Sequence, residues 1–413
     1  MKVMDGQPGA LILGSDFRAL AVVRSLGRRG IPTVLVDNLP RSAWFSRYVV
    51  ARHRWRGAMQ GAPLVEHLVR LAHDGGLAGW LLYPLYDDAV EMVSREAATL
   101  SKVYRLTTPP WSSVRRAVDK RLAYEAAELA SVPVPRTWHP TSLEELKSLD
   151  VVFPAIIKPA NSAPLQSVSR RKAFPASSSE ELASAYELAA ELVGTDGLMV
   201  QELIPGGGSS QFSVAAFCRD GEVLVSMTAR RSRQYPVDFG LGSSFVEAIE
   251  VPQLQPLAAA LIARLELSGL VEVEFKRDTR DGRYKLLDVN VRVWGWHGLC
   301  MDCGVDFPYV QYCETLGLPL PESRVVYGHR WRRLLTDLPA ALTEMRQGTL
   351  SPIAYAKSFW GPTSRSVLDL HDPAPAAGDL SVAAWRVLAA VGRPGARRGA
   401  SSLAKAPAMG GKR

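Results

Sequence analysis

The stretch VEVEFKRDTRDGRYKLLDVNVR, residues 271–292, places acidic and amide side chains where a buried strand normally has apolar ones. Two strand-like halves flank residues 278–282, whose composition is typical of a hairpin turn. Alternate side chains of a strand share a face. The hairpin would therefore align four polar groups, Glu272 and Glu274 on one strand and Asp288 and Asn290 on the other.

Two carboxylates held close together are costly unless a cation lies between them. An oxygen-rich cluster of this kind suits Mg²⁺, which commonly binds through one or two carboxylates together with substrate phosphates. The alternative is a solvent-facing strand that carries its acids on the wet side. The hairpin alone leaves both interpretations open.

The length of 413 residues is too great for one small core and predicts two or three domains. The hydrophobic fraction of 47% and the charged fraction of 22% are those of a globular protein in water. The first residues, MKVMDGQPG, lack the apolar core of a signal peptide, and no run of about 18 apolar residues is present. These features predict a cytoplasmic protein with no transmembrane segment.

The formal net charge of +8 lies largely at the C-terminal end. Residues 392–413 carry six Lys and Arg and no acid, in a Gly-, Ala-, Ser- and Pro-rich composition typical of a disordered tail. The rest of the chain is close to neutral, so we expect no nucleic-acid partner.

Three of the four cysteines follow His297 in the spacing His-x2-Cys-x2-Cys-x9-Cys. Cys300, Cys303 and Cys313 are the thiols that a zinc site here would use. The stretch also has helical apolar spacing broken by Gly304, and free cysteine is among the most buried residue types. Packed helices are therefore the stronger interpretation, with zinc as the alternative.

The N-terminal segment predicts a parallel βαβ unit. The strand ALILG ends at Gly14, a helix runs from about 17 to 29, and the strand TVLVD ends at Asp37. Asp37 lies 23 residues after Gly14 (37 − 14), as in a dinucleotide site, but GSDFRA lacks the other two glycines of that motif. A further strand, WLLYPLY, precedes a helix expected at 89–100, and the Pro109-Pro110 pair bounds this domain.

The region after residue 110 mixes helices and hairpins, which indicates an α+β arrangement. A helix is expected at 113–130, with Lys120 in its middle. The short strand FPAIIKP then ends in Lys158, which is either a phosphate ligand at a cleft or a lysine that reaches solvent. Residues 176–193 predict another helix, and a strand, a Gly-rich connector and a second strand follow it.

Four features occur in the order and rough spacing of the ATP-grasp superfamily: Lys120 in a helix, FPAIIKP with Lys158, VQELIPGG at 200–207, and EFKRDTRDGRYKLLDVNVR at 274–292. Within the superfamily the sequence looks most like the carboxylate-amine ligase branch, where D-aspartate ligases are found. The resemblance covers about residues 10–320. It implies an α/β N-terminal domain with a parallel sheet (pre-ATP-grasp) and an α+β ATP-grasp domain that holds the nucleotide between two sheets.

The expected divisions of the chain follow from this resemblance and from composition. They are an N-terminal domain at 1–110, an ATP-grasp domain at 111–320, a C-terminal helical extension at 321–391 and a disordered basic tail at 392–413.

The resemblance also implies nucleotide contacts. Lys120 and Lys158 match the two lysines that reach the ATP phosphates from the two walls of the cleft. The strand end that reads the adenine matches Gln201 and Glu202, with the backbone of Leu203 and Ile204 as its polar edge. The following GGGSSQ stretch, residues 206–211, would lie near the ribose.

The metal ligands implied by the resemblance are Glu274 and Asp288, with Asn290 completing the shell. Arg292 matches the arginine that stabilises the acyl phosphate or the transferring phosphate, a task suited to its fixed fork of donors. The implied cofactors are ATP and Mg²⁺, with Mn²⁺ as an alternative metal.

Two departures from the family pattern stand out. Many members have Asn-Pro-Arg where this chain has Asn290-Val291-Arg292. The loop after Lys158, NSAPLQSVSRRK, lacks the glycines with which many members cover the phosphates. A basic side chain could cover them instead: Arg170, Arg171 or, as our preferred candidate, Lys172.

The resemblance implies that ATP activates a carboxylate as an acyl phosphate and that an amine then attacks it, with release of ADP and phosphate. Arg230, Arg231 and Arg233 lie in a plausible substrate loop and are expected carboxylate binders, with Arg230 and Arg233 preferred. Trp294, Trp296 and His297 either line an acceptor pocket or, as we favour for the tryptophans, pack together. The alternatives are a non-catalytic nucleotide-binding regulator and a bicarbonate-activating carboxylase.

The C-terminal part is less informative. Helices are expected in HRWRRLLTDLPAALTEMRQG at 329–348 and in DLSVAAWRVLAAVGR at 379–393. Weak peripheral membrane contact of the tail and a homo-oligomer both stay open as partners, beside the small-molecule carboxylate and amine substrates. The sequence does not name those substrates.

Overall fold

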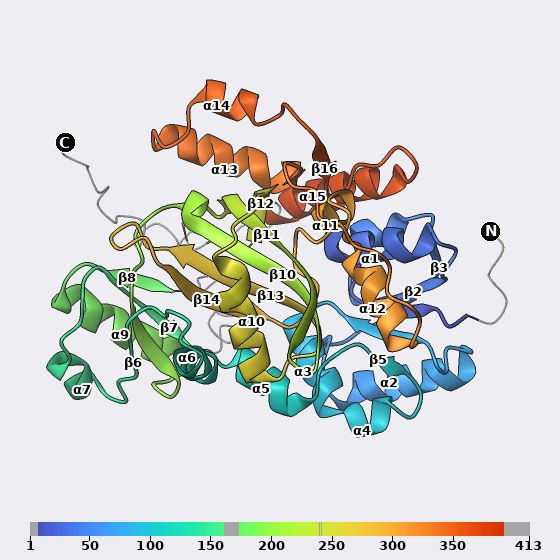
Figure 1. Cartoon of the computed structure of the whole chain (residues 1–413), viewed down its shortest axis with the longest axis horizontal. Helices are drawn as coiled ribbons and strands as arrows, with labels where there is room; N and C mark the ends of the chain where they lie inside the picture. Colours follow the sequence, from blue (N-terminus) through green and yellow to red (C-terminus); the bar gives the residue numbers. More distant parts are fainter. Residues whose placement is uncertain (1–6, 161–172, 239, 241, 392–413) are drawn as a thin grey trace.

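The computed structural model describes residues 7–160, 173–238, 240 and 242–391 (Figure 1). Its first part is a five-stranded parallel sheet in the order β3-β2-β1-β4-β5. The strands are β1 (Ala10–Leu13), β2 (Thr33–Asp37), β3 (Val49–Arg54), β4 (Leu81–Pro84) and β5 (Arg105–Leu106). The intervening elements are α1 (Phe17–Gly27), η1 (Ser42–Phe45), α2 (Ala62–Asp74), α3 (Asp87–Arg95) and α4 (Ala97–Leu100). The expected βαβ unit is confirmed.

The central part contains a four-stranded antiparallel sheet in the order β6-β9-β7-β8. Its strands are β6 (Thr137–Trp138), β7 (Ala155–Pro159), β8 (Phe174–Ala176) and β9 (Leu198–Glu202). The helices of this part are α7 (Leu143–Ser148) and α9 (Ser179–Val193), and α9 packs on β7 and β8.

A seven-stranded sheet faces it, in the order β14-β13-β10-β11-β12-β15-β16. Its strands are β10 (Gln211–Arg219), β11 (Glu222–Tyr235), β12 (Gly242–Ala248), β13 (Gly269–Arg277), β14 (Tyr284–Asn290), β15 (Arg330–Arg332) and β16 (Thr363–Arg365). Neighbouring strands are antiparallel except β15 and β16, which are parallel. The helix α10 (Leu254–Leu265) packs against β10 and β11, and η2 (Gly208–Ser210) precedes β10. The fold is therefore an α/β domain joined to a domain with two sheets, as expected.

The hairpin at 271–292 forms as predicted, from β13 and β14. Glu272 pairs with Asn290 and Glu274 with Asp288, and a bulge follows Glu274. The alternation of apolar and polar residues fixes this register, because a slip by one residue would move the acids into the apolar layer below.

The helix expected at 113–130 is two helices, α5 (Trp111–Val118) and α6 (Lys120–Leu129). Asp119 between them is extended, and its side chain accepts a hydrogen bond from the backbone N–H of Arg121. An Asp in this role starts a new helix. The break places Lys120 at the first position of α6, where its N–H lies 3.4 Å from the carbonyl oxygen of Ala160, just after β7.

The C-terminal segment contributes strands as well as helices. Arg330–Arg332, expected to be helical, forms β15 and extends the larger sheet together with β16. The helices are α11 (Gly298–Asp302), α12 (Phe307–Thr315), α13 (Leu334–Arg346), α14 (Pro352–Lys357) and α15 (Ala374–Val391). Among the described residues, no helix is both long and apolar enough to cross a membrane.

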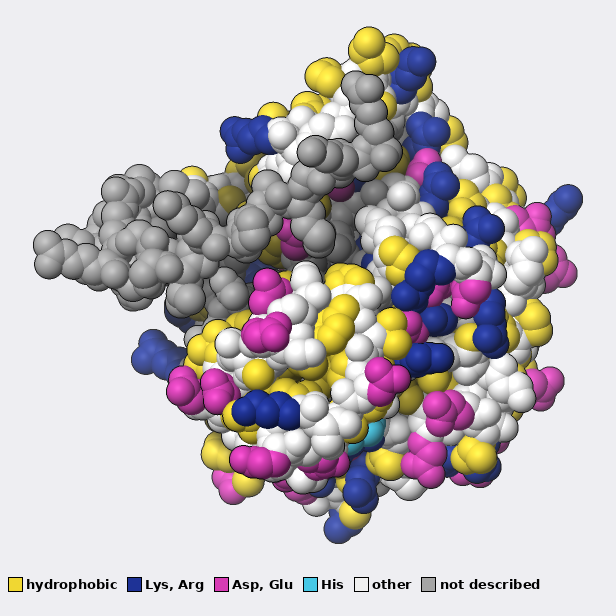
Figure 2. Space-filling model, turned by 90° about the vertical axis from the view of Figure 1, so that its left-hand side faces the viewer, with side chains coloured by type: hydrophobic (Ala, Val, Ile, Leu, Met, Phe, Trp, Pro, Cys, Tyr) yellow, Lys and Arg dark blue, Asp and Glu magenta, His cyan; other side chains and the backbone are white. Residues whose placement is uncertain are grey.

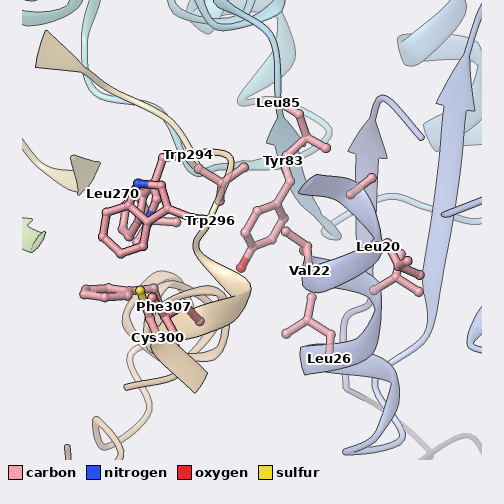
Figure 3. Packing of buried hydrophobic residues seen from close by; sticks show 14 of the residues in the cluster. Leu20, Val22, Leu26, Tyr83, Leu85, Leu270, Trp294, Trp296, Cys300 and Phe307 are labelled. Atoms are coloured by element: carbon pink, nitrogen blue, oxygen red, sulfur yellow. The ribbon is translucent and has the colours of Figure 1, made fainter. Parts of the chain in front are cut away.

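The largest core cluster joins the first domain to a segment more than 200 residues later in the chain. Val22 and Leu26 of α1 and Tyr83 of β4 lie on the side that faces Trp294 and Phe307 (Figure 3). The hydroxyl of Tyr83 donates to the carbonyl of Pro308 across this junction, at 3.0 Å. The first domain and the segment 293–312 are therefore packed as one unit.

The surface is mixed in charge. On the face in Figure 2, basic and acidic side chains of the described residues are interspersed. The basic residues 392–413 and the loop with Arg170, Arg171 and Lys172 lie outside the described part of the chain.

Candidate functional site

A cavity of about 1930 Å³ lies between the two sheets of the central part and reaches the carboxyl ends of β1 and β4. Small-molecule pockets are usually about 300–1,000 Å³, so this cavity has room for more than one ligand. The predicted nucleotide-binding, metal-binding and catalytic residues that lie in the described part of the chain all line it: Lys120, Lys158, Gln201, Glu202, Leu203, Ile204, Arg230, Arg233, Glu274, Asp288, Asn290 and Arg292.

The acidic groups of the hairpin gather on the cavity side of β13 and β14. The amide of Asn290 donates to Glu272 at 3.1 Å and to Glu274 at 3.0 Å. The indole N–H of Trp296 donates to the other oxygen of Glu272 at 2.8 Å. Burial, and then the neighbouring Glu274, raise the pKa of Glu272 to about 7. The cluster therefore holds more negative charge than its surroundings easily accommodate.

Two cations already balance part of this charge. Arg231 of β11 donates to Glu274 at 3.0 Å, across the intervening strand β10. The ammonium of Lys120 lies 2.7 Å from an oxygen of Asp288. Burial opposes the charge on Lys120, but Asp288 keeps its pKa above the usual value. Within the described residues, no three His, Cys, Asp or Glu side chains are grouped closely enough to hold a metal by themselves.

Lys158 enters the cavity from the smaller sheet. Its ammonium donates to the side-chain oxygen of Gln201 at 2.8 Å, and the Gln201 amide donates in turn to the hydroxyl of Thr137. Tyr124 of α6 lies beside the same ammonium, with its hydroxyl at 3.4 Å. Lys120 and Lys158 thus approach the cavity from different elements, α6 and β7, as the sequence predicted.

The strand end at 201–204 is held by basic groups from the larger sheet. Glu202 accepts from Lys285 at 2.7 Å and from Arg280 at 2.8 Å. Burial raises the pKa of Glu202, but these partners and a backbone N–H hold it below its usual value. Lys276 donates to the carbonyl of Ile204 at 2.7 Å, and burial lowers the pKa of Lys276 to about 8. Glu202 therefore links the two sheets rather than standing ready as a ligand.

Arg292 connects the hairpin to the first domain. Its guanidinium donates to both carboxylate oxygens of Asp87, at 2.5 and 3.0 Å, and to the side-chain oxygen of Asn290 at 3.2 Å. Burial opposes its charge, but Asp87 holds the pKa of Arg292 above its ordinary value. Asp87 is the first residue of α3, where a carboxylate also suits the helix dipole.

The three arginines of the expected substrate loop lie on β11 and have different partners. Arg230 donates to Glu247 at 2.9 Å and Arg231 to Glu274. Arg233 is buried and gives a two-pronged contact to the fully buried Asp337 of α13, at 2.8 and 3.1 Å. Arg230 faces the cavity, whereas Arg233 holds α13 against the sheet.

Several residues of the site were missed by sequence reasoning. Lys276 could have been found, because alternation along β13 puts it on the face of Glu272 and Glu274. Asp87 and Tyr124 lie in separate helices, and nothing in their local sequence indicates their partners, Arg292 and Lys158.

The residues of the alternative dinucleotide and zinc sites are buried in the structure. Asp37 accepts a 2.6 Å hydrogen bond from Ser15 and is fully buried, so it is not presented to a ribose. His297, Cys300, Cys303 and Cys313 are buried, and all four cysteines are free thiols. Burial lowers the pKa of His297 to about 4. Trp294 packs edge-on against Phe307 with ring centres 5.1 Å apart, as the packing interpretation predicted.

Comparison with protein families matches residues 195–332 to a family described as ATP-grasp in the biosynthetic pathway with Ter operon. A D-aspartate ligase of Enterococcus faecium is 26% identical over 243 residues, which cover 55% of this chain and 57% of that protein. The chain thus spans little more than half the length of this relative.

Solved structures with the same fold include a biotin carboxylase domain and an L-amino acid ligase. The first is the biotin carboxylase domain of the Hydrogenobacter thermophilus 2-oxoglutarate carboxylase with MgADP and bicarbonate (TM-score 0.63, 18% identity, 78% of this chain and 73% of that one). The second is the L-amino acid ligase of Bacillus licheniformis (TM-score 0.57, 14% identity, 75% and 74%). At these identities the likeness establishes the fold.

Proposed function

We propose that this chain is a member of the ATP-grasp superfamily and an ATP- and Mg²⁺-dependent ligase of its carboxylate-amine branch. The observation that supports this most is the convergence on one cavity of Lys120 from α6, Lys158 from β7 and the acidic hairpin β13–β14. The two lysines can bind the negatively charged phosphates of ATP, and the acidic side chains of the hairpin can bind the metal ion that accompanies them. A regulator that only binds a nucleotide would not need, beside the two lysines and the acidic hairpin, a cavity with room for further ligands.

The reaction that we propose has two steps. An oxygen of the carboxylate substrate attacks the γ-phosphorus of ATP, which forms an acyl phosphate and releases ADP. The amine substrate then attacks the acyl carbon, forms the C–N bond, loses a proton and releases phosphate. The protein contributes mainly by positioning the reactants and stabilising charge.

We assign the roles as follows. Lys120 and Lys158 bind the phosphates, and the backbone at Leu203 and Ile204 borders the adenine, with residues 206–211 near the ribose. The N–H of Leu203 already donates to the carbonyl of Pro154 at 2.8 Å, which leaves Ile204 as the backbone contact that we favour. Gln201 and Glu202 position this strand end through their own hydrogen bonds.

Arg292 is our candidate for stabilising the transferring phosphate, and Arg230 for binding the carboxylate substrate. For Arg233, also expected to bind substrate, the two contacts with Asp337 favour a positioning role. Lys172 stays a prediction for covering the phosphates, and it lies outside the described residues.

Glu274, Asp288 and Asn290 fit Mg²⁺ by the chemistry of their oxygen donors. The raised pKa of Glu272 supports this, since a cation would relieve the repulsion between Glu272 and Glu274. When bound, the metal would neutralise charge on the phosphates. Lys120 at Asp288 and Arg231 at Glu274 hold the same carboxylates in place, and Mn²⁺ is a substitute that we propose to test alongside.

A bicarbonate-activating carboxylase is the second candidate, because one structural neighbour was solved with bicarbonate. The sequence relative, a D-aspartate ligase, favours the amine ligase instead. We further propose a cytoplasmic location, which the four free thiols support. A homo-oligomer is consistent with the dimeric neighbour and is to be tested by its mass in solution.

The test is release of ADP and phosphate with MgATP over a panel of amino acids and small carboxylates, D-aspartate first. Hydroxylamine in the assay traps an acyl phosphate as a hydroxamate. Glu274→Gln and Asp288→Asn should each abolish substrate-dependent ADP release, while the exposed Glu322→Gln should not. ATP binding without turnover on any substrate, unaffected by either change, would contradict the ligase and the metal assignment together.

A further inference from the structure

One wall of the cavity is formed by α13, α14 and the loop between them. Thr336, Glu344, Gln347 and Leu350 line the cavity from this segment, together with Lys357. The matched family region ends at residue 332, so this wall lies beyond it. A wall contributed by a separate segment can shape one substrate site while the nucleotide site is unchanged.

This wall is fixed to the sheet by a buried ion cluster. Asp337 of α13 is fully buried and contacts Arg233 at 2.8 Å and Arg332 at 3.2 Å. Arg332 also donates to the carbonyl and the hydroxyl of Ser358, directly after α14, at 2.7 and 2.8 Å. Its guanidinium lies 3.6 Å from the ring centre of Phe359. The wall is therefore anchored at both helices.

The arginines near this wall form ion pairs with carboxylates other than Glu344. Arg230 and Arg330 both contact Glu247, Arg233 contacts Asp337, and Arg333 lies 3.6 Å from Asp379. Glu344 differs from these acids. Within the described residues its carboxylate has no hydrogen bond and no ion pair, although the residue is half-buried and lines the cavity. Burial and the nearby Asp337 raise the pKa of Glu344, and the charge of Arg233 opposes this shift only in part.

We propose that Glu344 binds an ammonium group of the amine substrate, and that the acceptor carries a second positive charge in addition to the amine that reacts. This inference rests on the proposed ligase function and deepens it. The acceptor class is a diamine, or a molecule that ends in one, such as a basic amino acid. Lys357 on the same wall would repel that charge, so the binding depends on Glu344.

The sheet order separates Glu344 from the reaction centre. The hairpin acids lie on β13, and α13 packs on β11 and β12, which are two and three strands away. Strands are about 4.8 Å apart, so the two ends of the acceptor are on the order of 10 Å apart. A reacting amine at the acyl phosphate and an ammonium at Glu344 therefore require a chain between them. We expect affinity to depend on the length of that chain.

The first test measures binding, which requires no turnover. α,ω-Diamines with three to eight methylene groups are titrated calorimetrically into the full chain with MgADP, and each is compared with the monoamine of equal length. We expect one length to bind roughly 10- to 100-fold more tightly than its monoamine, and Glu344→Gln to remove this difference. Lys357→Met, the matched control on the same wall, should preserve or increase it.

The second test separates this inference from the ligase function. Hydroxamate formation reports carboxylate activation and should be equal in wild type and Glu344→Gln. Amide formation with the preferred diamine should fall through a higher KM, while kcat with saturating amine is retained. Equal binding of diamines and monoamines by the wild type, or a preference that persists in Glu344→Gln, would overturn the assignment of Glu344. Absence of hydroxamate with every carboxylate would instead count against the ligase.

Discussion

At the scale of single residues, the site is governed by how buried charges are paired. Lys120 and Asp288 neutralise each other, as do Arg231 and Glu274. Among the described residues, the hydrogen-bond donors to Glu272 are neutral, and Glu272 lies beside Glu274. A buried carboxyl in such surroundings favours its protonated form. The pKa of Glu272, raised to about 7, is the direct expression of this.

The raised pKa of Glu272 predicts how stability depends on pH. Its ordinary value is 4.5, so between about pH 4.5 and pH 7 the folded state binds more protons at Glu272 than the unfolded state does. The contribution of Glu272 is therefore complete below pH 4.5 and is lost as pH rises through 7. Measured by denaturant unfolding without ligands, the stability of wild type minus that of Glu272→Gln should fall over this range.

Glu322→Gln, an exposed acid, serves as the control and should give a difference that does not vary with pH in this way. A wild type minus Glu272→Gln difference that stays constant from pH 4.5 to pH 8 would show that Glu272 titrates normally.

At the scale of elements, the break between α5 and α6 decides where Lys120 points. Asp119 caps α6, and the first residue of that helix reaches the end of β7. The sequence pattern did not predict this break, because the apolar positions continue on both sides of Asp119. The capping contact depends on the extended backbone of Asp119, which the pattern does not reveal.

We expect Asp119→Ala to destabilise the chain by about 1 kcal/mol, the usual value of an N-cap. It should also raise the KM for ATP, since Lys120 loses its fixed position. Ser178→Ala removes the equivalent cap of α9, where the side chain accepts from Glu181. That control should lose similar stability with no change in KM, and equal KM values for both variants would disprove the positional role.

The attachment of α13 gives a larger expected effect. Asp337→Asn leaves Arg233 and Arg332 buried without their anionic partner, which typically costs about 3–5 kcal/mol. Thermal unfolding should shift downward, and hydrogen exchange should increase in residues 333–358 of the folded state. Glu66→Gln breaks only an exposed pair with Arg70 and should change stability by less than about 1 kcal/mol. Similar shifts in the two variants would exclude the anchoring role of Asp337.

At the scale of the whole molecule, the sequence predicted those features that depend on local pattern. The βαβ unit, the hairpin register and the positions of Lys120 and Lys158 at one cavity follow from alternation, strand ends and the family resemblance. Contacts between elements that are far apart in the sequence could not be predicted, because they depend on the order of the strands in the sheet. Arg231 and Glu274 meet across β10, so their contact depends on the order of the strands in the sheet. Arg233 contacts Asp337, which is 104 residues away in the sequence.

The pair of Arg292 and Asp87 joins the first domain to the hairpin. Arg292→Lys keeps the charge but loses the two-pronged contact. We expect kcat to fall roughly 10- to 100-fold, as for a lost hydrogen bond to a charged group. Asp87→Asn, which keeps the arginine, should lose less. Steady-state kinetics of both variants measure this. A greater fall of kcat in Asp87→Asn than in Arg292→Lys would contradict the role of Arg292 at the transferring phosphate.

The core that unites α1 and β4 with Trp294 and Phe307 also has a consequence for synthesis on the ribosome. Chains emerge N-terminus first, and domains generally fold in that order. Here the first sheet has an apolar face that stays uncovered until residue 312 or so has left the exit tunnel. The apolar face of the N-terminal domain therefore stays exposed until more than three quarters of the polypeptide has been made, and we expect the nascent chain to depend on chaperones throughout that interval.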